Sequence, residues 1–182
     1  MAHGSSMDGV TFAVIGDYGK DNAAELAVSN LVKDQLHPDF VVTVGDNTYG
    51  SINIDTAIGK YYSEYIGNYQ GVYGPGSDVN RFYPALGNHD WDDGGGLRAY
   101  LDYFTLPGNE RYYEFTQGPV QFFVLDSDPR EPDGTKANSV QAQWLQQGLA
   151  SSTAEWQIVV AHHPPYSSGA AHGPSEDLRW PY

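Results

Sequence analysis

Four short segments of the chain combine an apolar run with side chains that can bind a metal ion. They are VIGDYG, TVGDNTYG, ALGNHD and VVAHHPPY, and in each the polar residues come directly after the apolar ones. Carboxylate oxygens, an amide, a phenol and imidazoles are ligands that suit Mn, Fe, Zn or Mg. The residues concerned are Asp17, Asp46, Tyr49, Asn88, His89, Asp90 and His162.

The apolar runs are expected to be buried strands that lie side by side. Residues 10–15 and 40–44 are rich in Val, Ile and Phe, and a helical spacing of apolar residues separates them over 23–36. In such α/β units, ligand sites gather beyond the carboxyl ends of the strands, where adjacent loops converge. We therefore expect the metal-competent residues to share one region. The apolar positions of the intervening helix are Leu26, Leu31, Val32 and Leu36.

The rest of the chain continues this alternation and then adds hairpin-like strands. Helices are expected over 54–69, near 97–104 and from about 140, the last one capped by Asn138 or Ser139. Residues 126–139 form a long connection that is a candidate loop over a site. Together these elements predict helices packed on a mixed sheet system. The further strands are expected around 82–86, 112–115, 120–126 and 156–161.

Composition narrows the classes of partner. The 182 residues include 9 Lys and Arg against 23 Asp and Glu, a formal net charge of −14. Nucleic acid and anionic membranes need a cationic face, so neither is expected as a partner. A small phosphorylated substrate is compatible with this acidity if bound metal ions supply positive charge. The chain has no Cys, which excludes thiolate metal sites and disulfides.

The four segments together resemble the metallophosphoesterases, and specifically the purple acid phosphatase branch of that calcineurin-like superfamily. The matching patterns are Asp-x-Gly in DYG, Gly-Asp-x-x-Tyr in GDNTY, Gly-Asn-His-Asp in GNHD and Val-x-x-His in VVAH. They occur in the family's order and span residues 11 to about 176. The resemblance implies an α/β (α+β) fold, a sandwich of mixed β-sheets flanked by helices.

The resemblance also implies a dinuclear metal centre that hydrolyses phosphate esters with a metal-activated water. The residue matching Asp46 bridges the two ions in this family. One ion is then expected to bind Asp17, Asp46 and Tyr49, and the other Asp46, Asn88 and His162. A phenolate ligand favours Fe(III), and the neutral Asn88 suits a divalent Fe, Zn or Mn on the other side.

Other polar residues receive substrate and supporting roles by the same resemblance. His89 is expected beside the substrate, where it stabilises the phosphate or protonates the leaving group, and Asn88 is expected to contact substrate as well. Asp90 is expected to be catalytic by orienting His89, and His172 to contact the substrate. His163 is expected to support the metal ligands from behind, or to be structural.

One family block, Gly-His-x-His, has no match here, since no histidine follows His172. We therefore expect residues 8–182 to be the amino-terminal portion of a metallophosphoesterase domain, with its last strands missing, or a separate carboxyl-terminal fragment to complete the site. Residues 1–7 resemble an expression tag. A shortened protein with weak metal binding is the alternative.

Three functions stay open from the sequence. The first is an acid phosphatase-like phosphomonoesterase, the second a phosphodiesterase on the same scaffold. The third is a non-catalytic module that binds metal or phosphate, because the last two histidine ligands are absent. Taken singly, each of these Asp, Asn and His residues fits an ordinary turn or surface position, so the prediction depends on the four blocks together. The family resemblance and low lysine content favour an extracellular or periplasmic location.

Overall fold

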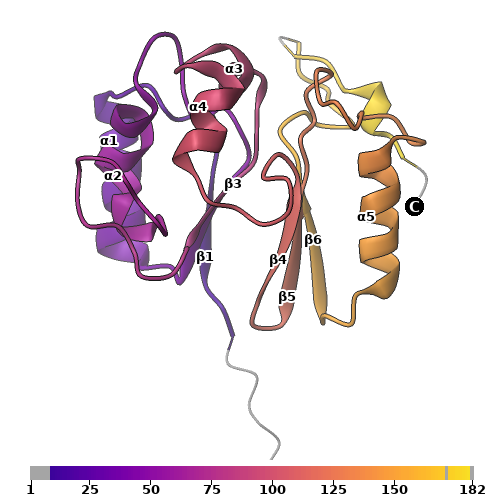
Figure 1. The fold of residues 1–182 in the computed structure, drawn as a ribbon, viewed down its shortest axis with the longest axis horizontal. Coiled ribbons are helices and arrows are strands. Elements are labelled where there is room, and N and C mark those ends of the chain that lie inside the picture. Colours follow the sequence, from indigo (N-terminus) through magenta and orange to yellow (C-terminus); the bar gives the residue numbers. More distant parts are fainter. Residues whose placement is uncertain (1–8, 171, 181–182) are drawn as a thin grey trace, which may run out of the picture.

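Two small sheets face each other, and helices cover their outer sides (Figure 1). The computed structural model describes residues 9–170 and 172–180, so the tag-like residues 1–7 lie outside the described residues. This arrangement confirms the expected sandwich of mixed sheets flanked by helices. No helix of the described ranges has both the length and the apolar character needed to cross a membrane.

The first sheet carries three of the four metal-competent segments. Its strands are β1 (Phe12–Ile15), β2 (Phe40–Thr43) and β3 (Phe82–Pro84), in the order β1-β2-β3 and all parallel. All four residues of the central strand β2 are buried. Parallel pairing places the carboxyl ends of the three strands at one edge, where the polar residues that follow them meet.

The second sheet brings in the last segment. A hairpin joins β4 (Tyr113–Gln117) to β5 (Val120–Val124), and β6 (Trp156–Val160) then pairs parallel with β5. Helix α5 (Val140–Ser151) makes the crossover between β5 and β6 and begins at Ser139, whose hydroxyl accepts the amide hydrogen of Ala142. The end of β6 therefore points the same way as the end of β5.

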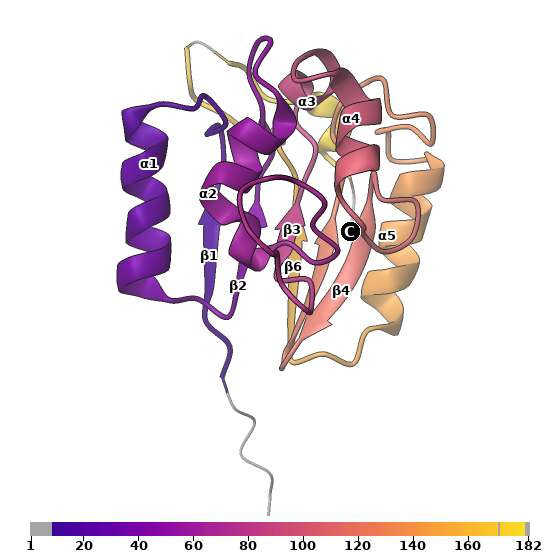
Figure 2. The same ribbon diagram turned by 60° about the vertical axis from the view of Figure 1, so that its left-hand side comes forward.

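Aromatic side chains join the two sheets. Phe122 of β5 makes edge-on contacts with Phe12 and Phe40 of the first sheet, with ring centroids 5.1 and 5.5 Å apart. Phe115 of β4 stacks on Tyr83 of β3 at 3.6 Å. Figure 2 shows the two sheets side by side along this contact. The contact holds the carboxyl ends of both sheets at one end of the molecule.

Helix α1 (Ala23–Asn30) and the wider turns of Leu31–Leu36 correct the expected apolar face. Leu26, Leu31 and Leu36 are 43–54% exposed, whereas Glu25, Ser29 and Val32 are the buried positions. Within α1 the inward positions are Glu25 and Ser29, so Leu26 already faces outward. After Asn30 the spacing becomes π-helical, and of the expected apolar positions only Val32 is buried. His37, in a left-handed conformation, ends this segment.

The remaining helices cover the first sheet and approach the site. Residues 55–65 are helical in three short pieces, namely Asp55–Gly59, α2 (Lys60–Tyr62) and Ser63–Tyr65. Two further helices, α3 (Asn88–Asp92) and α4 (Gly96–Tyr103), follow β3, and a short turn at Glu176–Leu178 lies near the end of the described chain. The GNHDW segment was expected only as a strand end. It starts α3 at once, so Asn88 and His89 occupy the first turn of a helix.

Candidate metal centre

The turns after β1 and β2 have the same unusual backbone. Asp17 and Asp46 both have φ of 54°, in the left-handed region that non-glycine residues seldom occupy. The amide of Asp17 donates to the carbonyl of Gly45 at 3.1 Å, and the amide of Tyr18 donates to that of Asp46 at 3.2 Å. These bonds join the two turns, so the carboxylates of Asp17 and Asp46 lie close together.

The first turn of helix α3 packs against the Asp46 carboxylate. The amide of His89 donates to Asp46 Oδ1 at 2.9 Å, so a carboxylate lies at the amino-terminal end of the helix. A Cβ atom at Gly87 would overlap the Asp46 side chain, which explains why a glycine precedes Asn88. Asp46 is therefore held from both sides and is only 4% exposed.

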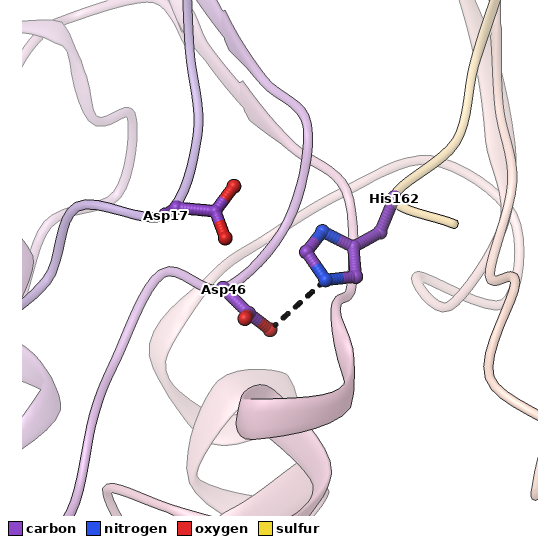
Figure 3. A group of neighbouring side chains, drawn as sticks. All are labelled: Asp17, Asp46 and His162. Carbon is purple, nitrogen blue, oxygen red and sulfur yellow. Dashed lines mark ion pairs between the residues drawn. The ribbon is translucent and has the colours of Figure 1, made fainter. Parts of the chain in front are cut away.

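Three ligand atoms from Asp17, Asp46 and His162 lie within 4.8 Å of one another (Figure 3). His162 Nε2 is 3.4 Å from Asp46 Oδ1. The Tyr49 hydroxyl lies 3.2 Å from both Asp17 Oδ1 and Asp46 Oδ2. Side chains from the ends of β1, β2 and β6 thus converge on the Asp46 carboxylate, as the sequence predicted.

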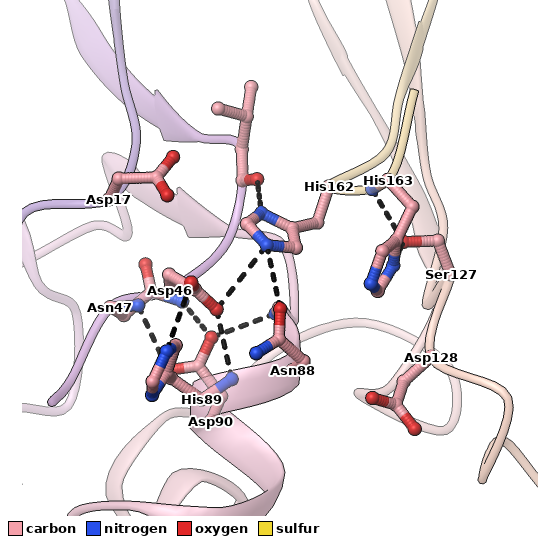
Figure 4. A network of polar contacts seen from close by, with 12 residues as sticks. Asp17, Asp46, Asn47, Asn88, His89, Asp90, Ser127, Asp128, His162 and His163 are labelled. Carbon is pink, nitrogen blue, oxygen red and sulfur yellow. Dashed lines mark hydrogen bonds and ion pairs between the residues drawn. The ribbon is translucent and has the colours of Figure 1, made fainter. Parts of the chain in front are cut away.

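The hydrogen bonds of His162 leave a lone pair facing this cluster. Its Nδ1 lies 2.8 Å from the carbonyl of Val44, which can only accept, so Nδ1 carries a proton and, in the neutral ring, Nε2 has the free lone pair. Nε2 then points at Asn88 Oδ1, 3.2 Å away, and at Asp46 (Figure 4). With the ring neutral, the three facing atoms are all acceptors, an arrangement that a bound cation stabilises.

On the Asp17 side of the cluster, hydrogen-bond acceptors outnumber the available hydrogens. Two carboxylates share the single hydroxyl hydrogen of Tyr49. Burial, and then the charges of Asp46 and Asp17, raise the pKa of Tyr49 well above its ordinary value, so the phenol keeps its proton unless a cation offsets these charges. The donor set of oxygens and one imidazole fits a hard or borderline metal ion. The residues present therefore fit the expected metal ligands.

All five expected ligands line one cavity of about 510 Å³. His89 and His163 also line it, and the exposed His172 lies at its edge, so the expected substrate histidines are brought to the same space. Lys20 lines the cavity too, and sequence reasoning missed it. Its position three residues after Asp17 is the only signal that could have identified it.

The carboxylate that contacts His89 is Asp93 rather than Asp90, which corrects the sequence prediction. His89 Nδ1 hydrogen-bonds Asp93 Oδ2, four residues later and one helical turn away. Its Nε2 lies 4.0 Å from Asp46 Oδ2, and its ring contacts that of Tyr49 with centroids 4.4 Å apart. Side chains at i and i+4 share a helix face, whereas adjacent residues point apart, so Asp90 faces away from His89.

Asp90 braces the turn after β2 instead of lining the cavity. Its carboxylate accepts hydrogens from the amide of Gly87, the amide of Asn47 and the Asn47 side chain, at 2.8–3.0 Å. Burial raises the pKa of Asp90 to about 7. Asn47 is fully buried and also bonds Tyr18, Thr43 and Ala85. The pair fixes the backbone that presents Asp46 and Tyr49, a function that residue spacing did not reveal.

His163 contacts the loop of residues 126–139, and this loop in turn contacts helix α3. Ser127 Oγ accepts the amide hydrogen of His163 at 3.0 Å and forms a second hydrogen bond with its Nδ1 at 2.9 Å. Burial, followed by the neighbouring His162, lowers the pKa of His163 and keeps it neutral. Arg130 of the loop binds the Asn88 carbonyl at 3.2 Å and Asp92 at 2.6 Å. The loop therefore fastens helix α3 from outside the cavity.

Comparison with known proteins agrees with this geometry. A family model described as calcineurin-like phosphoesterase matches residues 10–181. Purple acid phosphatases 7 and 17 of Arabidopsis thaliana are each 27% identical to the chain, over 93% of it and 57% and 56% of their own lengths. The chain thus spans little more than half of these curated relatives.

A solved structure shares the fold. It is GAP50, the anchor in the inner membrane complex of Plasmodium, with a TM-score of 0.57 and 22% sequence identity. The match covers 92% of this chain and 59% of the other. The likeness extends over most of the chain and concerns its architecture alone.

Proposed function

The chain belongs to the calcineurin-like phosphoesterase family, and from this membership we propose that it is a metal-dependent phosphoric ester hydrolase of the acid phosphatase type. The observation that supports the proposal is the convergence of Asp17, Asp46, Tyr49, Asn88 and His162 on one cavity. Segments far apart in sequence supply these side chains, and their oxygen and nitrogen atoms face one another.

Two metal ions are proposed, with Asp46 shared between them. Its two oxygens face different partners: Oδ2 faces Tyr49 and Oδ1 faces His162. Asp17 and Tyr49 would complete one set of ligands, and Asn88 and His162 the other. When bound, such a pair supplies an acidified water and neutralises charge on the phosphoryl group.

His89 is proposed to donate a proton to the leaving oxygen or to stabilise the phosphate. Asp93 holds its Nδ1, which leaves Nε2 directed toward Asp46 and the cavity. Imidazole is the side chain that most often transfers protons to or from reacting groups in enzymes. His172 lies at the edge of the cavity, where it can contact the part of the substrate that extends outward.

Replacing Asp46 tests the proposal most directly. Asp46→Asn keeps the shape and removes the negative charge of the shared carboxylate, so we expect hydrolysis of an aryl phosphate to fall by at least about a hundredfold. Metal content should fall in parallel, and a chelator should reproduce the loss in the unaltered chain. Asp78→Asn, an exposed position outside the cavity, should retain activity. Full hydrolysis by metal-depleted Asp46→Asn protein would contradict the proposal.

Iron at the Tyr49 side is a finer part of the same proposal. A tyrosinate bound to Fe(III) absorbs visible light, and Tyr49→Phe would remove the band. Rates on matched mono- and diesters would separate the phosphodiesterase alternative. Metal content of one ion or none with no turnover would favour the non-catalytic alternative.

The extracellular or periplasmic location and a fragment that completes the site stay predictions. Cell fractionation tests the first. Recovery of activity on adding a carboxyl-terminal segment of a relative tests the second.

A further inference from the structure

Lys20 is the one Lys or Arg among the described residues that line the cavity. Its side chain is exposed, and its Nζ lies 4.3 Å from the centre of the Tyr49 ring. The ammonium group therefore stands beside Tyr49, on the same wall as Asp17. In a chain with a net charge of −14, a permanent cation at this place is distinctive.

Neighbouring cations are neutralised by carboxylates, whereas Lys20 is not. Lys60 binds Asp21 at 2.7 Å, and Arg130 binds Asp92 at 2.6 Å. Within residues 9–170 and 172–180, Lys20 forms no ion pair closer than 4.0 Å. Its contact with the neutral Tyr49 ring leaves the three ammonium donors available to an anion.

The backbone that carries Lys20 is firmly held. The Lys20 amide donates to the carbonyl of Tyr18 and to Glu25 Oε2, which is 2.9 Å away, and the Asp21 amide donates to the same oxygen at 2.7 Å. Glu25 is 4% exposed. Gly19 packs so closely on the Asn47 carbonyl that a Cβ there would overlap it. The backbone of the turn therefore has little freedom, and it presents the Lys20 and Asp17 side chains to the cavity.

We propose that Lys20 is a specificity-determining residue that binds a non-bridging oxygen of a phosphomonoester dianion. This inference rests on the proposed function and names its substrate class. A monoester has three non-bridging oxygens and a diester has two. Hence the monoester has an oxygen to spare for an ammonium beside the metal-competent side chains, and it also carries more negative charge.

The charge of the substrate also favours a monoester over a diester at this site. A phosphate monoester carries about −1.5 to −2 at pH 7, and a diester carries a single negative charge. Each additional cation in a cavity favours the more highly charged ester. Lys20 can contribute one such cation because its ammonium group contacts the Tyr49 ring and not a carboxylate of the candidate metal ligands.

The test compares Lys20→Gln, Lys20→Arg and the unaltered metal-loaded chain on matched aryl mono- and diesters. We expect Lys20→Gln to raise KM for the monoester about tenfold, the loss of one charge-assisted hydrogen bond, and to leave KM for the diester nearly unchanged. Lys20→Arg should restore most of the affinity. Lys136→Gln changes the net charge equally at an exposed site outside the cavity and serves as the control.

Inorganic phosphate provides a second readout that does not require turnover. Calorimetric binding of phosphate to the metal-loaded chain should weaken about tenfold in Lys20→Gln and not in Lys136→Gln. If the unaltered chain binds phosphate but hydrolyses nothing, the proposed enzyme fails while the assignment of Lys20 is still tested. Equal phosphate affinity in Lys20→Gln, or a loss explained entirely by lower metal content, would overturn the inference.

Discussion

At the scale of single residues, the site depends on residues whose backbone is held in a high-energy conformation. Asp17 and Asp46 adopt a left-handed backbone, and such positions cost of order 1–3 kcal/mol each. The surrounding bonds from Gly45 and His89 hold them there. This cost is consistent with selection for the position of the carboxylates rather than for stability.

We expect Asp93 to position the imidazole of His89. Asp93→Asn removes the charge that holds the imidazole Nδ1, so we expect kcat to fall by about tenfold to a hundredfold with a smaller change in KM. Steady-state kinetics on an aryl phosphate measures the effect. Asp102→Asn, which breaks an exposed pair with Arg98, is the control. Equal kcat in Asp93→Asn and Asp102→Asn would refute a positioning role for Asp93.

At the scale of elements, the loop between β5 and α5 is fastened by a buried ion pair. Arg111 donates to Glu131 from two nitrogens, at 2.9 and 3.1 Å, and to Asp133 at 3.1 Å. The Glu131 side chain is fully buried. The same loop carries Arg130, which binds helix α3. Stability of the loop and order of the site are therefore coupled.

Removing the cation of this pair should be strongly destabilising. Arg111→Met leaves Glu131 buried without its partner, and we expect the free energy of unfolding to fall by about 3 kcal/mol. Arg98→Met breaks a pair whose side chains are 91% and 70% exposed and should change it by less than about 0.5 kcal/mol. Urea denaturation of both variants makes the comparison. Similar losses in the two variants would mean that burial of Glu131 does not set the cost.

At the scale of the whole molecule, the fold buries several acids in a chain that is already acidic. Burial, the largest cause in each case, raises the pKa of Asp126 to about 8 and the pKa values of Asp90 and Glu25 to about 7. Their ordinary values are 3.8, 3.8 and 4.5. The folded chain thus retains protons that the unfolded chain has already released.

The pH dependence of stability follows from this difference. Between about pH 4 and pH 8 unfolding releases protons, so the free energy of unfolding should decrease as pH rises, by up to roughly 1.4 kcal/mol per pH unit for each group. The lowered pKa values of Asp93 and Asp128 act below pH 4 and do not oppose the trend. The lowered pKa of His163 opposes it near and below pH 6.5, as one group against three. Urea denaturation of chelator-treated protein at pH 5 and pH 8 measures it.

Asp126→Asn isolates one contribution, because it keeps the shape of a fully buried side chain and removes its ionisation. Its stability should depend less on pH than that of the unaltered chain. Asp34→Asn, at an exposed position, should leave the dependence unchanged. Parallel profiles for all three proteins would show that burial of Asp126 has no effect on stability in this range.

The sequence alone determined the strand ends and the family, and it predicted which polar side chains gather at one place. A hydrophobic strand followed by Asp, Asn or His is a local pattern, and parallel strands necessarily bring such ends together. This is why Asp46 and His162, 116 positions apart in number, could be paired in advance and lie 3.4 Å apart.

Only the tertiary structure decided which neighbours each side chain meets. Residue order could not show that Asp93 rather than Asp90 contacts His89, because α3 begins one residue after Gly87 and sets the directions of the side chains. Nor could it show that Lys20 lies against the Tyr49 ring or that Leu26 faces outward. Those outcomes depend on side-chain direction and on packing between distant elements, which a one-dimensional pattern does not contain.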